Sequence, residues 1–304
     1  MFLRATLLFG LVFGIGQQTD EVGNLAKQLK DANAEVRSKT ALALASYGAK
    51  AAPAVPALVE ALKDDKSEVR GHAAYALGRV GPAADKAVPA LAAAAKDKDV
   101  QVRRLACDAM GRLAPDSKEA FAELVVMLKD PDLAPRAADA FGRLGSAAKD
   151  AIPGLSAALQ TPGVRGYAAF ALGKIGKDAL PALTEATKDK NADVRIDAVV
   201  ALAMVGPEAA PVLGEALKDK DADVRLNCLS SIMKLGAAGK EAVPALAGAL
   251  KDSDDEIRQR AARALGLLGA EAKAAVPALE EAKNDKVDKV RQAMVDALEK
   301  IRGK

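Results

Sequence analysis

The segment that decides the fold is VRGHAAYALGRVG, residues 69–81, which returns almost letter for letter as VRGYAAFALGKIG at residues 164–176. In both copies small alanines surround one large apolar side chain, and a glycine closes the segment. The large apolar position recurs every 30 to 33 residues, at Leu44, Leu77, Met110, Phe141, Leu172, Leu202, Ile232, Leu265 and Leu298. That period fits two helices and two short turns, so the sequence predicts tandem helix pairs.

The first helix of each pair, helix A, is predicted to begin at a proline, because the first helical turn does not need that N–H. These prolines are Pro56, Pro89, Pro153, Pro181, Pro211, Pro244 and Pro277. Apolar residues four apart, such as Leu58 and Leu62, then fall on one face of the helix.

The second helix, helix B, is predicted to begin after a side chain that accepts hydrogen bonds from free backbone amides. These residues are Asn33, Asp99, Asp130, Thr161, Asn191, Asp221 and Asp254. It is predicted to end at a glycine that can adopt positive φ. These glycines are Gly48, Gly81, Gly145, Gly176, Gly206, Gly236 and Gly269. One position inside helix B is Ala in eight of nine copies, with Ser231 as the exception, which predicts close packing between repeats.

One helix pair cannot bury both of its faces, so the repeats must stack. We therefore predict an all-α fold, a right-handed α-α superhelix of about nine helix-pair repeats within residues 17–304. The predicted repeats span approximately 20–52, 53–87, 88–119, 120–151, 152–179, 180–210, 211–242, 243–275 and 276–304.

Residues 1–16 have a different composition from the repeats. Arg4 precedes an uncharged apolar run over residues 5–15, and Gly14 and Gly16 suit cleavage before Gln17. This pattern predicts a signal peptide and export to the periplasm or the extracellular space. The run is shorter than the ~20 residues that span a bilayer, so we expect no membrane span in the mature chain. An uncleaved signal would instead anchor the protein to the membrane.

Composition excludes several classes of site. The formal net charge is only +3, with 44 Lys and Arg against 41 Asp and Glu, which disfavours nucleic acid as the partner. Cys107 and Cys228 lie four repeats apart, too far for a disulfide, at positions that are mostly Ala elsewhere. With a single histidine they make no zinc site, and we predict no cofactor.

The segments 69–81 and 164–176 resemble the HEAT-like repeats of phycobilin lyase subunits, a group to which deoxyhypusine hydroxylase is also similar. The resemblance covers about residues 20–302 and implies a HEAT-type solenoid. In the hydroxylase subgroup, His-Glu pairs near the start of helix B bind two irons. The matching pairs here include Gly71/His72 and Gly166/Tyr167, and none is His-Glu. The resemblance thus argues against a di-iron hydroxylase and leaves a bilin lyase-like or other modifying enzyme as the alternative.

An arginine follows the first valine of helix B in most repeats, and an aspartate recurs in the turn before it. The arginines are Arg37, Arg70, Arg103, Arg165, Arg195, Arg225, Arg258 and Arg291. The aspartates are Asp64, Asp97, Asp189, Asp219, Asp252 and Asp285. We interpret them as a structural ladder of ion pairs between adjacent repeats rather than as a phosphate-binding surface. Repeat four interrupts the ladder, with Ala134 in the arginine position.

Helix B positions that the repeat does not fix form one stripe, which in HEAT-type arrays faces the concave side. Tyrosine and arginine are enriched at binding hot spots. The stripe residues that we predict to bind a partner are His72, Tyr75, Arg79, Arg112, Tyr167, Phe170 and Lys174. A purely structural interpretation stays open, because basic residues also suit the end of a helix and aromatic side chains can fill gaps between repeats.

No catalytic residue is predicted. Asp108 and Asp139 occupy equivalent positions in successive repeats, but Arg104, Arg112, Arg136 and Arg143 lie nearby in the sequence pattern and indicate a solvated charge network. The basic residues Arg79, Arg112, Arg143 and Lys174 also allow a nucleic-acid-binding solenoid as a weaker alternative. We predict a monomeric, non-catalytic scaffold that binds a protein or an extended peptide.

Overall fold

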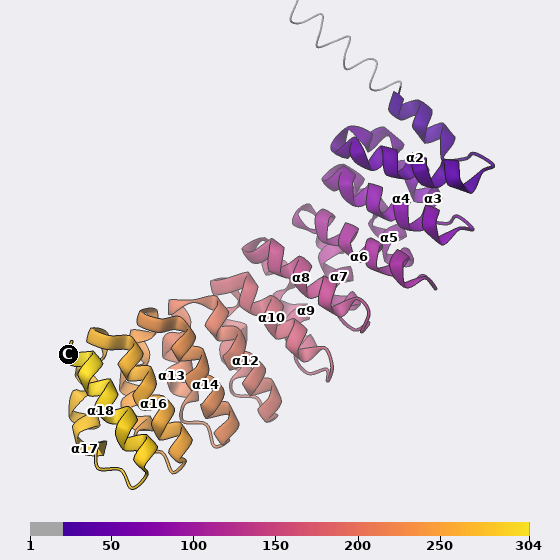
Figure 1. Ribbon diagram of the computed structural model, residues 1–304. Helices are drawn as coiled ribbons and strands as arrows, with labels where there is room; N and C mark the ends of the chain where they lie inside the picture. The colour runs from indigo at the N-terminus through magenta and orange to yellow at the C-terminus, as the bar shows by residue number, and fades with distance from the viewer. Residues whose placement is uncertain (1–20, 304) are drawn as a thin grey trace, which may run out of the picture. The chain divides into compact units, whose positions relative to one another are not determined.

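The computed structural model describes residues 21–303, in which the helices are joined by short turns and no β-strand occurs (Figure 1). The predicted all-α fold is therefore confirmed. The predicted signal peptide, residues 1–16, lies outside the described residues. Within residues 21–303, no helix combines the length and the apolar character needed to cross a bilayer.

The chain forms two compact units, one ending at Leu144 and the other beginning at Gly145. Helix A of the first repeat covers residues 21–28. The first unit continues with α2 (Ala34–Ser46), α3 (Val55–Ala61), α4 (Ser67–Val80), α5 (Val88–Ala94), α6 (Val100–Leu113), α7 (Lys118–Met127) and α8 (Ala134–Leu144). From α2 onward, even-numbered helices are the predicted B helices and odd-numbered helices are the A helices.

The second unit holds five more helix pairs. Its helices are α9 (Ile152–Ala158), α10 (Arg165–Ile175), α11 (Leu180–Ala186), α12 (Ala192–Val205), α13 (Ala210–Ala216), α14 (Ala222–Leu235), α15 (Val243–Ala249), α16 (Asp255–Leu268), α17 (Val276–Ala282) and α18 (Asp288–Arg302). Within each unit, successive B helices lie side by side, as α4 and α6 do in the first unit and α16 and α18 do in the second (Figure 1).

Most B helices end where a glycine reverses the sign of φ, and all seven predicted glycines have φ between 52° and 113°. The helix α6 is an exception, because Ala114 follows it with φ −52°. At Gly81 this backbone, with φ 73° and ψ −145°, leads into a short 3-10 segment, Gly81–Ala87. The following helix, α5, then carries Pro89 in its first turn. Similar 3-10 segments precede α3 and the A helices from α7 onward, and the proline pattern did not predict them.

The predicted start of helix B is correct where an Asn or Asp side chain caps it. Asp99, for example, accepts hydrogen bonds from the amides of Gln101 and Val102. The prediction was wrong for Asp130 and Thr161, because α8 and α10 begin later, at Ala134 and Arg165. The Asp130 carboxylate instead accepts from the Asp132 amide within the turn. As a result α8 and α10 have 11 residues each, whereas α4, α6 and α12 have 14.

The core consists of leucines and alanines contributed by both helices of each pair. The recurrent large residue is fully buried in most repeats, as Leu77 and Leu172 show. Small residues let neighbouring B helices approach closely. A methyl group added at Gly78 on α4 would lie only 2.7 Å from the Ala109 Cα on α6. Such contacts make the stacking of helix pairs the source of the buried surface.

Candidate functional site

The Arg and Asp ladder ties neighbouring repeats together inside each unit. Arg70 donates from Nε to Asp97 at 2.6 Å and from Nη2 at 2.9 Å, and from Nη1 to the carbonyls of Asp64 and Asp65. Arg70 is only 6% exposed. The paired carboxylate raises the pKa of Arg70, and the guanidinium lowers the pKa of Asp97. Since these donors are used within the protein, Arg70 has little capacity left for a phosphate.

The same interaction recurs at four more positions. The pairs are Arg37 with Asp64, Arg195 with Asp219, Arg225 with Asp252, and Arg258 with Asp285.

Three predicted members of the ladder have other partners. Arg103 has Asp130 at the usual spacing, with Nε 3.7 Å from its carboxylate, but its guanidinium donates a hydrogen bond to Asp132 in the same turn. Arg165 donates to Asp193 and Asp197, both on α12.

Because Arg165 pairs with α12, the Asp189 carboxylate forms no ion pair with a ladder arginine among the described residues. Its carboxylate accepts a hydrogen bond from the Gln160 side chain at 2.8 Å, and the amide of Asn191 also donates to it. Arg291 pairs with Asp288 on its own helix and donates to the carbonyl of Asp285. At these positions the ion pairs differ from the predicted pairing of each ladder arginine with a turn aspartate of the adjacent repeat.

The residues predicted to bind a partner form two groups, one in each unit. In the first unit, the His72 ring Nδ1 lies 2.8 Å from the Ser38 hydroxyl, and Tyr75 is half-buried. Arg79 and Arg112 are exposed, and neither forms an ion pair with any residue in the described part of the chain.

The second group lies on α10. Tyr167 and Phe170 are each 37% exposed, a large fraction for aromatic side chains one helical turn apart. The Lys174 ammonium lies 5.5 Å from the centre of the Phe170 ring, within the range of a cation–π interaction. This helix therefore presents an apolar surface beside a positive charge.

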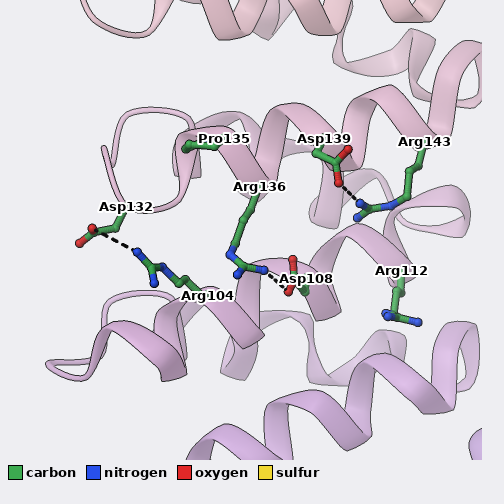
Figure 2. Close-up of a pocket in the computed structure, with 8 residues that line it drawn as sticks. All are labelled: Arg104, Asp108, Arg112, Asp132, Pro135, Arg136, Asp139 and Arg143. Atoms are coloured by element: carbon green, nitrogen blue, oxygen red, sulfur yellow. Dashed lines mark hydrogen bonds and ion pairs between the residues drawn. The ribbon is translucent and has the colours of Figure 1, made fainter.

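A pocket of about 670 Å³ opens between α6 and α8 in the first unit, and Figure 2 shows its lining. Its walls are formed by Arg104, Asp108, Arg112, Asp132, Pro135, Arg136, Asp139 and Arg143. Arg136 donates to Asp108 at 2.6 Å, and Arg143 pairs with Asp139. Arg104 lies 4.0 Å from Asp132.

The pocket coincides with the irregular repeat. Because α8 begins late, Asp132 lies in the preceding turn and Pro135 occupies the first turn of the helix. Our set of binding residues contained Arg112 but not Arg136 or Arg143, which we assigned to a charge network. Both arginines lie on α8, and their spacing of seven residues, together with the broken repeat, was the available sequence signal.

Two further features bear on chemistry. Cys107 and Cys228 are free and buried, and burial raises the pKa of the Cys107 thiol to about 12 and also raises that of Cys228. Over residues 21–303, no three or more His, Cys, Asp or Glu side chains are grouped as metal ligands.

Tandem helix pairs joined by buried ladder residues define an α-solenoid. Among protein families, the profile described as HEAT repeats matches residues 23–105, 152–233 and 210–299. The chain therefore belongs to the HEAT repeat family. The match does not distinguish the phycobilin lyase type from other HEAT repeats, so that subtype stays a resemblance.

Comparison with solved structures returns similar chains at low identity. One is an engineered protein, 24% identical with a TM-score of 0.41, and the match covers 92% of this chain and 88% of that one. Another is human deoxyhypusine hydroxylase in complex with glycerol, 22% identical with a TM-score of 0.37, covering 96% of this chain and 99% of that one. No curated protein sequence matches this chain.

Proposed function

We propose that this protein is a non-catalytic HEAT-repeat scaffold that binds a protein or an extended peptide on the exposed side of its B helices. The observation that carries the proposal is the location of exposed large apolar side chains. Six of the seven in the described residues lie on B helices, and they are Leu42, Tyr167, Phe170, Val200, Leu267 and Val295. Val126 on α7 is the exception.

Packing within the repeat does not account for these side chains. The inward positions of helix B are already filled by buried residues such as Ala171 and Leu172. Phe170 and Val200 project from the remaining face of α10 and α12, where exposing apolar area to water is unfavourable by roughly 25 cal/mol per Å². A partner that covers them would recover this free energy.

The A helices offer a competing surface. A second cavity of about 430 Å³ lies mainly along α11 and α13, and Glu215 is one of its exposed lining residues. This A-helix surface, in the same unit as Phe170 and Val200, can therefore serve as the control surface for the proposed B-helix surface.

The test is site-specific photo-crosslinking of the full chain in its native host. A photoreactive residue is placed at Phe170 or Val200 on the B helices, or at Glu215 on an A helix. We expect a discrete crosslinked partner from the first two positions only. Equal capture from Glu215, or capture from Glu215 alone, would refute the assignment of the surface.

The identified partner is then purified and its affinity measured against a Tyr167→Ala, Phe170→Ala double variant. Truncation of two aromatic anchors at an interface is expected to cost about 2–4 kcal/mol in binding. An Arg291→Ala variant, altered at a position remote in sequence from both aromatics, is the control and should bind as the unchanged protein does. Unaltered affinity of the double variant would remove these two residues from the interface.

We also propose that the scaffold is exported, on the basis of the N-terminal sequence pattern, and that it is a monomer. N-terminal sequencing of the protein from its host should show Gln17 as the first residue. Full-length protein that begins at Met1 and remains inside the cell would contradict export.

A further inference from the structure

The pocket between α6 and α8 has an imbalance of charge that its own ion pairs do not cancel. Four arginines and three aspartates line it, which leaves one positive charge in excess. Arg136 pairs with Asp108, Arg143 pairs with Asp139, and Arg104 lies near Asp132 (Figure 2). Arg112 is the pocket arginine that has no carboxylate partner within the described residues.

Arg112 is nevertheless held in place along its stem. A methyl group added at Gly78 on α4 would lie 3.3 Å from the Arg112 Cδ, so the stem of Arg112 lies against the glycine of the preceding repeat. The guanidinium end is exposed. A stem fixed by packing loses less conformational freedom when the charged end binds a ligand, which favours binding.

We propose that this pocket binds the carboxylate of an acidic residue in a polypeptide partner, with Arg112 as the principal ion-pairing residue. The inference rests on the proposed scaffold function and specifies the chemistry of one contact. A guanidinium and a carboxylate match in a planar, bidentate arrangement that is stronger than a neutral hydrogen bond.

The three aspartates explain why the ligand is a peptide carboxylate and not a more highly charged anion. A phosphate dianion or a nucleic acid backbone would meet the carboxylates of Asp108, Asp132 and Asp139 in the same pocket, against a single unpaired arginine. A polypeptide carries amide N–H groups next to its acidic side chains. Asp139, whose side chain is 67% exposed, can accept hydrogen bonds from such donors while Arg112 binds the carboxylate.

The experiment measures binding of a fluorescently labelled peptide, with one central Glu among Gly and Ser residues, to the purified full chain by anisotropy. The same peptide with Gln in place of Glu reports the carboxylate contribution. We expect the Arg112→Gln variant to weaken binding of the Glu peptide by about tenfold, as the loss of a charge-assisted pair predicts. Arg112→Lys should recover only part of that loss, because lysine keeps the charge without the planar fork.

Arg263→Gln is the control. Arg263 lies on α16 in the second unit, is exposed and has no ion pair among the described residues, and it does not line the pocket. Its substitution should change affinity by less than about twofold, as expected for a distant exposed charge screened by salt.

Three results would overturn the proposal. They are equal affinity for the Glu and Gln peptides, equal losses for the Arg112 and Arg263 variants, and stronger displacement of the peptide by inorganic phosphate or single-stranded DNA than by an unlabelled Glu peptide. Crosslinking at Phe170 that persists alongside any of these results leaves the scaffold function intact and rejects only the pocket. Loss of all crosslinking with Arg112-dependent peptide binding would reject the scaffold and retain the carboxylate site.

Discussion

Substitution of Gly173 by alanine tests whether close approach of neighbouring B helices stabilises the stack. A methyl group at this position on α10 would lie 2.8 Å from the backbone oxygen of Ala201 and 2.7 Å from the Met204 Cε. Met204 can rotate away, but the backbone oxygen can move only if α12 moves with it. Overpacking of this kind costs about 1–3 kcal/mol. Alanine also favours the helix over glycine by up to about 1 kcal/mol, so the net destabilisation should be roughly 0–2 kcal/mol.

The control is Gly166→Ala in the same helix, where an added methyl group meets nothing within 4 Å. This variant gains the same helix propensity as Gly173→Ala but introduces no steric clash. It should therefore be neutral or stabilising by up to about 1 kcal/mol. Urea unfolding monitored by circular dichroism should therefore separate the two variants by about 1–3 kcal/mol. Equal free energies of unfolding for the two variants would refute the claim that this interface is close-packed.

Three other perturbations have defined outcomes. Ala171→Leu, at a fully buried position, should destabilise the second unit by about 1–3 kcal/mol, and an unchanged thermal melt would contradict that. Arg37 lowers the pKa of Asp64 to about 2, so the unfolded chain binds more protons below about pH 4 and the stabilisation fades as pH falls through 2. Asp64→Asn should flatten this part of the stability–pH profile, and a retained slope would assign it to other groups. The buried thiols of Cys107 and Cys228 should react slowly with iodoacetamide until urea unfolds the protein, whereas rapid native labelling would show that they are accessible.

Local signals predicted most of the fold because they act within a few residues. A proline starts α5, Asp99 caps α6, and Gly81 ends α4, each through a backbone requirement that the sequence shows directly. The errors at Asp130 and Thr161 arose because a side chain that can cap a helix can also stabilise a turn. Choosing between these outcomes depends on packing against the neighbouring repeat, which the local sequence does not contain.

The candidate site was less predictable for the same reason. The register placed Arg112 and Phe170 on the exposed stripe, where the structure also finds them exposed. The repeat register does not show which of these arginines form ion pairs with a carboxylate. Arg136 reaches back to Asp108 across 28 residues of sequence, and Arg165 pairs with Asp197 rather than with Asp189. Such pairings follow from side-chain reach between helices.

The contact between Gly78 and the stem of Arg112 has a consequence for how this surface can change. Gly111 and Gly266 are placed similarly, near Arg143 and Lys300 of the repeats that follow them. The orientation of a displayed charge is thus governed by a residue about thirty positions earlier that no ligand would touch. Changing the ligand specificity of such a surface therefore requires two substitutions, one at the exposed charged residue and one at the buried small residue of the preceding B helix. A mutagenesis screen that is restricted to exposed positions would omit the second of them.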